Sequence, residues 1–321
     1  MMKPTAAALK PSDAQAASSG RRRRLKAIAG NYQLYLFLLP TLVFFAIFAY
    51  WPMYGVTIAF KDFSVSKGIL GSPWVGWKHF ERFFDSFNFW DLMGNTLGLS
   101  LLGLLITFPL PIILALSLNQ VTHLRFKKFV QTTVYAPFFI STVVLSGMVL
   151  VFLSPTGIVN QALVHLAGHS PILFMSKPEY FKAVYILSDV WQGTGFGAII
   201  YMAALAGVNP EIHEAAIMDG ATKWQRVLHV DLPSIMPTAV ILLILAVGNV
   251  MNIGFEKAYL LQTPTNLPAA EIISTYVYKV GLKQSQYSFS AAVGLFNSVI
   301  NLILLVTVNK AAKKLSNTSL F

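Results

Sequence analysis

Two histidines of this sequence have a spacing that could hold a metal ion. His165 and His169 stand four residues apart, so that on one helix both imidazoles could reach the same ion. The residues between them include no glutamate, and no third ligand is evident in the sequence. We therefore interpret them as a surface pair and predict no metal site.

Three acidic residues could serve glycoside chemistry, which needs paired carboxylates. Glu81, Asp85 and Asp91 fall in one segment, but tryptophans and basic residues are interleaved with them, which favours a folded loop at a membrane surface. The glycine-rich run 193–197 lacks the lysine of a phosphate-binding loop and is expected to permit close helix packing or a kink. We predict no catalytic residue.

The segment from Asn209 to Gly220 has the signals of a short capped helix. Asn209 suits the N-cap, Pro210 the first helical position, and Gly220 the left-handed conformation that ends a helix. A second short helix is expected over Thr222–Val230, before the next apolar segment. Taken alone, this pattern is typical of a surface hairpin between two apolar segments.

The composition indicates where these elements lie. Hydrophobic residues make up 55% of the 321 residues and charged residues 12%, about half the share usual in soluble domains. This excludes an ordinary soluble enzyme and a disordered chain, and the absence of cysteine excludes a disulfide scaffold. Six segments are long and apolar enough to span a bilayer as helices. They are Leu34–Phe60, Leu97–Leu118, Phe129–Leu153, Ala183–Val208, Ser234–Phe255 and Ser288–Asn309.

Basic residues set the orientation of these spans. The net charge is +11, and the run Arg21–Arg24 precedes the first span. By the positive-inside rule both termini are cytoplasmic. A nucleic-acid-binding arm is the alternative, but the position beside a span favours an anchor on anionic lipid. We expect a basic cytoplasmic tail at 1–30, a six-span membrane domain at 31–310, and a short cytoplasmic tail at 311–321.

Some polar residues lie within the apolar segments, where burying them in lipid is costly, and such residues tend to face a cavity. The alternative is that the carboxamides join helices and the tryptophan lies at an interface. The candidates are Asp189, Trp191, Gln192, Asn249, Asn252, Asn297 and Asn301.

The loop before the fifth span resembles the EAA loop of ATP-binding-cassette (ABC) importer permeases. Glu214-Ala215-Ala216 is followed after three residues by Gly220 and, further on, by Leu232-Pro233. Val230 stands where the family usually has isoleucine. The resemblance implies an all-α polytopic membrane protein with the six-helix fold of type I importers, in the bacterial cytoplasmic (inner) membrane.

A second likeness extends from about residue 30 to the C-terminus. Segments such as Pro52-Met53-Tyr54-Gly55, Gly71–Gly76 and Leu153–Asn160 are similar to the polysaccharide-type branch of sugar importer permeases. Within that branch the chain most resembles the membrane subunits of alginate-type importers. The resemblance implies import of an oligo- or polysaccharide.

The same resemblance implies partners and a mechanism. Such a chain pairs with a second permease, usually a homologue, and works with two cytoplasmic ATPases and an extracytoplasmic binding protein. ATP and magnesium are bound by the ATPases, and no cofactor by this chain. Pro210–Met218 would be the coupling helix that docks on an ATPase, with Gly220 as its joint. The residues that the resemblance assigns to coupling are Glu211, Glu214, Ala215, Ala216, Asp219, Gly220, Leu232 and Pro233.

For a sugar, the polar residues of the last three spans would line the path, since carboxamides suit hydroxyls and tryptophan suits a pyranose face. No lysine or arginine lies within any predicted span, which argues mildly against an acidic sugar. Two alternatives stay open. One is an ion-coupled secondary transporter with Asp189 as the coupled carboxylate, and the other is a polytopic membrane enzyme.

Overall fold

A computed structural model of the chain describes residues 30–168 and 170–316. The tail predicted at 1–30 lies almost wholly outside these residues, as do His169 and the last five residues of the tail predicted at 311–321. Across the described ranges the chain is helical, apart from turns and an isolated antiparallel bridge between Lys61 and Trp74. The predicted all-α fold is therefore confirmed. The chain divides into two units, residues 1–57 and 58–321, and each is described by itself.

The first unit contains an apolar helical run. It comprises α2 (Tyr32–Phe45), η1 (Ala46–Tyr50), α3 (Trp51–Met53) and the beginning of η2 (Tyr54–Phe60). The helices from Tyr32 to Phe60 are together 29 residues long, enough to cross a bilayer. An apolar surface of this size suits lipid or another subunit and not water.

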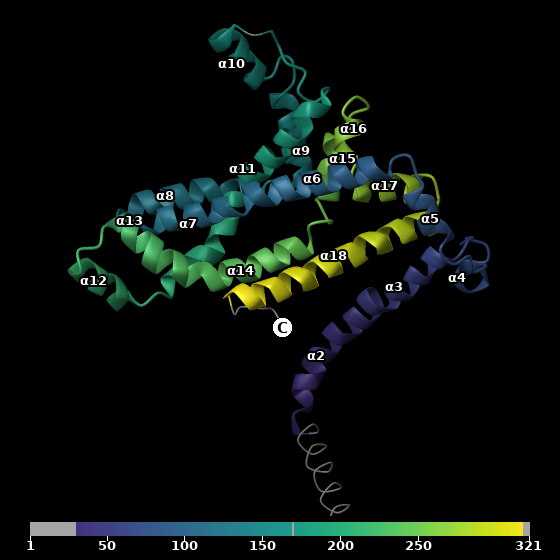
Figure 1. The fold of residues 1–321 in the computed structure, drawn as a ribbon, viewed down its shortest axis with the longest axis horizontal. Helices are drawn as coiled ribbons and strands as arrows, with labels where there is room; N and C mark the ends of the chain where they lie inside the picture. Colours follow the sequence, from purple (N-terminus) through teal and green to yellow (C-terminus); the bar gives the residue numbers. More distant parts are fainter. Residues whose placement is uncertain (1–29, 169, 317–321) are drawn as a thin grey trace, which may run out of the picture. The chain divides into compact units, whose positions relative to one another are not determined.

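Three further helices of the second unit are long and apolar enough to be spans. The first joins α6 (Phe89–Thr107) to α7 (Pro109–Asn119), and the last is α18 (Tyr287–Ser316). Between them in the sequence, α13 (Lys223–Arg226), η4 (Val227–Asp231) and α14 (Leu232–Gly248) form one helix of 26 residues. Helices α14 and α18 pack against each other (Figure 1). Two bent helix pairs bring the candidate spans of the described chain to as many as six.

The third predicted span, Phe129–Leu153, is not one straight helix. Helix α8 (Leu124–Tyr135) and the 3-10 turn η3 (Ala136–Phe139) meet α9 (Thr142–Phe152) at 98°. The break has a local cause, since Pro137 lacks an amide proton and Ser141 caps α9 by accepting a hydrogen bond from Val144 N at 3.3 Å.

The fourth predicted span, Ala183–Val208, corresponds to the long helix α11 (Pro178–Ala206), which contacts α6, α7, α8 and α14. Its glycine run has the packing role that the sequence predicts. A Cβ atom at Gly195 would lie 1.9 Å from the carbonyl oxygen of Val134 on α8, so only glycine allows this approach. A Cβ atom at Gly197 would lie 3.1 Å from Cγ of Pro111 on α7, a tight contact but not a clash with backbone.

The segment in which tryptophans are interleaved with acidic and basic residues is folded, as the sequence predicts. Phe60 stacks on Trp74 with ring centroids 5.5 Å apart and meets Trp77 edge-on at 5.6 Å. Among the described residues no group of three histidines or carboxylates could hold a metal. The short helices are α4 (Gly68–Gly71), α5 (Lys78–Phe84), α10 (Ile158–Ala167), α12 (Pro210–Met218), α15 (Phe255–Leu261), α16 (Leu267–Ala270), α17 (Ile273–Tyr278) and η5 (Lys279–Lys283).

Candidate functional site

Helix α12 has the bounds and the caps that the sequence predicts. Oδ1 of Asn209 accepts a hydrogen bond from Glu211 N at 3.1 Å, and Pro210 is the first helical residue. The chain then turns at Gly220, whose φ of +80° lies in the left-handed region. Helix α12 is therefore a short, well-capped helix that ends at a glycine joint.

The element after the joint differs from the prediction of a second short helix. Thr222 and Gln225 form a capping box, and the helix that begins there runs through η4 into α14 without interruption. Leu232 and Pro233 therefore lie inside a continuous helix and do not start a span. The glycine joint connects α12 directly to a membrane-crossing helix.

Most of α12 is uncovered by the described chain. Ile212, Ile217 and Met218 are 50%, 53% and 86% exposed. Glu211, Glu214, Ala215 and Asp219 are exposed too, and Ala216 is half-buried. A cavity of about 260 Å³ opens at the joint, lined by residues that include Ala216, Asp219 and Gly220. Helix α12 thus presents an exposed apolar surface beside the predicted coupling residues.

One contact from α12 to the helical body was not predicted. Nε2 of His213 lies 3.2 Å from Oδ1 of Asp231, whose side chain is fully buried. Asp231 also accepts hydrogen bonds from Gln120 Nε2 at 2.8 Å and Asn119 Nδ2 at 3.4 Å, at the end of α7. The signal for Asp231 in the sequence is weak, because it consists only of an acidic residue just before an apolar run.

Two of the seven predicted path residues share a cavity. Asp189 on α11 and Asn249 after α14 line a space of about 220 Å³, together with Ser100 and Thr107 of α6 and Tyr185 of α11. The fifth span was predicted to continue to Phe255, but its helix ends at Gly248, so Asn249 lies in the following turn. This turn brings a carboxamide and backbone groups to the cavity beside a carboxylate.

A lysine that the sequence places outside the spans pairs with Asp189, which lines this cavity. Nζ of Lys257, on α15, donates hydrogen bonds to Oδ1 of Asp189 at 2.6 Å and to the carbonyl oxygen of Tyr185 at 2.7 Å. Nζ also lies 4.2 Å from the centroid of the Tyr185 ring. The Lys257 side chain is 5% exposed and that of Asp189 39%. A cation therefore does lie beside one of the predicted path residues, contrary to the expectation from the sequence, and it is paired with Asp189.

The other five predicted residues mainly join helices. Gln192 donates to the carbonyl oxygen of Ile140 at 2.8 Å, across the break between η3 and α9. Asn297 donates to Asn252 at 2.9 Å, and Asn301 accepts from the Met251 amide at 3.0 Å, so α18 holds the turn after α14.

Trp191 points elsewhere. It lines a separate, larger cavity of about 660 Å³ whose other lining residues are almost all apolar. The structure therefore does not bring Trp191 together with Asp189, although both lie on α11.

Residues 107–317 match the family of binding-protein-dependent transport system inner membrane components. The chain belongs to this family, the membrane-embedded permeases of ABC importers. It is thus a multi-pass inner-membrane subunit without catalytic activity of its own, and ATP is bound by partner ATPases. Membership of this family excludes both alternative interpretations of the sequence, the ion-coupled transporter and the membrane enzyme.

Individual relatives are similar over nearly the whole chain. The polygalacturonan/rhamnogalacturonan transport system permease protein YteP of Bacillus subtilis (strain 168) is 44% identical over 302 residues, covering 94% of each chain. Protein LplB of the same strain is 44% identical over 298 residues, covering 92% of this chain and 93% of that one.

The fold is also that of solved transporters. A chain in the crystal structure of a bacterial ABC transporter involved in the import of the acidic polysaccharide alginate is 41% identical, with a TM-score of 0.85 over 92% of this chain and 99% of that chain. A bacterial alginate ABC transporter in complex with an alginate pentasaccharide-bound periplasmic protein has a chain with the same TM-score and 40% identity. The importer permease fold predicted from the sequence is confirmed.

Proposed function

We propose that this permease imports oligosaccharides of acidic sugars, of the pectic or alginate type. The observation that carries the proposal is the 44% identity, over 94% of each chain, to a permease named for polygalacturonan and rhamnogalacturonan transport. The similarity to the alginate transporter points to the same class of uronate-containing substrate. Pairing of Asp189 with Lys257 supports it, because a neutralised carboxylate repels an anionic sugar less than a free one.

We infer that α12 is the coupling helix. It ends at the glycine joint, exposes Ile212, Ile217 and Met218, and continues through that joint into a membrane-crossing helix. A capped helix with small residues permits close contact with an ATPase surface, and its displacement would rock the span attached to it. Glu211, Glu214 and Asp219 would be the polar contacts with the ATPase.

We further propose that the sugar passes the cavity of Asp189 and Asn249. Gln192, Asn252, Asn297 and Asn301 then support the path by holding helices, and Trp191 faces a separate cavity. Residues 31–310 would act as one membrane domain. The complex would contain a second, homologous permease, two ATPase subunits and an extracytoplasmic binding protein.

Uptake by the reconstituted complex tests the function. The complex is placed in liposomes with its binding protein outside, and uptake of labelled trigalacturonate is measured with and without ATP inside. We expect uptake that requires both ATP and the binding protein, and little uptake of uncharged maltotriose. Uptake that persists without ATP, or equal uptake of the uncharged sugar, would overturn the proposal.

A further inference from the structure

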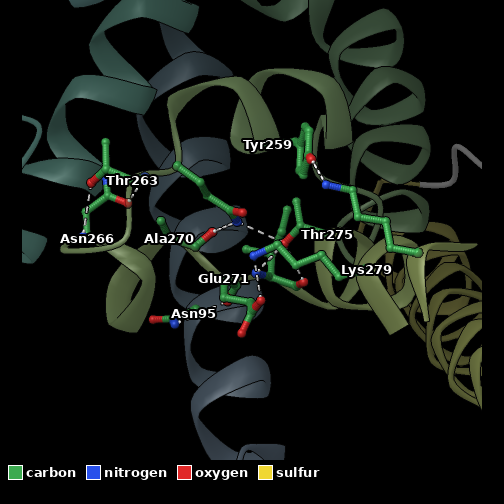
Figure 2. A network of polar contacts seen from close by, with 11 residues as sticks. Asn95, Tyr259, Thr263, Asn266, Ala270, Glu271, Thr275 and Lys279 are labelled. Carbon is green, nitrogen blue, oxygen red and sulfur yellow. Dashed lines mark hydrogen bonds and ion pairs between the residues drawn. The ribbon is translucent and has the colours of Figure 1, made fainter. Parts of the chain in front are cut away.

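The segment between α14 and α18 carries a network of polar contacts, some of them to other parts of the chain (Figure 2). Asn266 is fully buried, and its Nδ2 donates to the carbonyl oxygens of Leu261 and Met175, both at 3.0 Å. Lys279 and Glu271 form an ion pair at 2.8 Å, and Asn95 of α6 donates to the Glu271 carbonyl oxygen at 3.2 Å. These contacts tie α15 to η5 together and to its neighbours, and we call the segment from α15 to η5 the platform.

Three aromatic rings gather on this platform. Phe255 and Tyr259 of α15 are stacked, with centroids 5.7 Å apart and planes at 18°. Tyr278 of α17 lies 5.0 Å from Phe255 and 5.2 Å from Tyr259. All three side chains are partly exposed. Aromatic rings with one open face are suited to the apolar face of a ligand ring.

A lysine stands beside these rings with its charge unpaired by any acid of the described chain. Nζ of Lys283 donates to the Tyr259 hydroxyl at 2.5 Å and lies 5.1 Å and 5.7 Å from the ring centroids of Tyr259 and Tyr278. Lys283 is exposed. Its neighbour Lys279, in contrast, is neutralised by Glu271. The two tyrosines thus hold an ammonium group in place and leave it free to meet an anion.

A cavity of about 420 Å³ lies next to the aromatic group. Phe255, Tyr278 and Tyr287 line it, together with Ser274 and Ser290. The hydroxyl of Ser274 is buried and has no hydrogen-bond partner among the described residues. The volume falls in the range of small-ligand sites, and the serine hydroxyl offers a hydrogen bond to a polar ligand.

We propose that this aromatic group, Lys283 and the adjacent cavity form a binding site for one acidic sugar unit of the transported chain. The pyranose ring stacks on Tyr278 and Phe255, its carboxylate meets Lys283, and a hydroxyl bonds to Ser274. The topology places this segment on the extracytoplasmic side, where the sugar arrives before it reaches Asp189. The inference deepens the proposed function and rests on it.

Saturation-transfer NMR on the purified complex, without binding protein, tests the site because it detects weak sugar binding directly. The probes are trigalacturonate and its methyl ester, which keeps the rings but removes the charge. Only the acid can accept a charge-assisted hydrogen bond from Lys283, and such bonds are stronger than neutral ones. We therefore expect the acid to bind severalfold more tightly than the ester.

Lys283→Met should abolish this preference, while Lys283→Arg should keep most of it. Lys177→Met is the matched control, because Lys177 is also an exposed lysine near a tyrosine ring, that of Tyr180 at 5.8 Å, but its ammonium group is paired with Glu179 at 3.9 Å. A preference that survives Lys283→Met, or is missing in the unmodified complex, overturns the site. If ATP-driven uptake of trigalacturonate still occurs in that case, only this inference fails, and without such uptake the proposed function fails too.

Discussion

Nε2 of His213 on α12 lies 3.2 Å from Oδ1 of Asp231, which is fully buried at the cytoplasmic end of the α13–α14 helix. Asp231 also accepts a hydrogen bond from Gln120 at 2.8 Å, so one carboxylate joins α12, the fifth span and the end of α7. The glycine joint leaves α12 free to pivot, and the His213–Asp231 contact limits that freedom. We propose that movement of α12 passes through this junction into two spans.

Asp231→Asn should loosen this junction. The amide group presents an N–H donor to neighbours that are themselves donors, and a buried polar group left unsatisfied costs about 1–3 kcal/mol. We expect faster amide hydrogen exchange in α12 and in the end of α7, measured on the purified complex. His229→Ala is the control, since His229 is exposed and bonds within its own helix, to the Gln225 carbonyl oxygen. Unchanged exchange in α12 would mean that the contact does not position it.

The ion pair of Asp189 and Lys257 leads to a second prediction, about the stability of the complex and its uptake of sugar. Removing one partner of a buried ion pair lowers the free energy of unfolding by about 3–5 kcal/mol. Because the Asp189 side chain is partly exposed, we expect a loss at or below the lower end of that range. Lys257→Met should lower the melting temperature of the complex and reduce trigalacturonate uptake, because a free carboxylate then faces the path. The double variant with Asp189→Asn should recover part of both. If Lys257→Met and the double variant lose equally in melting temperature and in uptake, Lys257 does not act by pairing with Asp189.

Gly220→Val should separate ATP hydrolysis from transport. With φ at +80° and no neighbouring atom within 4 Å of the place that a Cβ would take, the cost of valine is backbone strain of roughly 1–3 kcal/mol and not a clash. We expect fewer sugars imported per ATP hydrolysed, with the complex still assembled. Gly168→Val is matched, since Gly168 also has a positive φ, +64°, and open space but ends α10. If both variants lower the ratio equally, the joint has no special role.

Much of the fold could be predicted from the sequence because lipid imposes simple rules. Apolar length marks the spans, and caps mark α12, which begins and ends where Asn209, Pro210 and Gly220 indicate. The break at Pro137 and the end of the fifth span at Gly248 were not predicted. Apolar composition alone does not distinguish a straight helix from two bent ones, and membrane helices tolerate proline.

The site was less predictable for a different reason. Spacing along one helix groups Asp189 with Trp191 and Gln192, but the three side chains point to different neighbours. Lys257 and Asp231 were missed because their partners are far away in sequence, at Asp189 and Gln120. A buried charge is recognised only with its partner, and the partner becomes visible only in the folded chain.

The central claim is that α12 docks on the ATPase and passes its movement to the spans. Because the chain has no cysteine, single cysteines can be introduced without background. Met218→Cys, at an 86% exposed position on α12, should cross-link to the ATPase, and its yield should change when ATP closes the ATPase pair. Leu166→Cys, 88% exposed on α10, is the control and should give no cross-link. Failure of Met218→Cys to cross-link in a complex that still imports trigalacturonate would contradict the account.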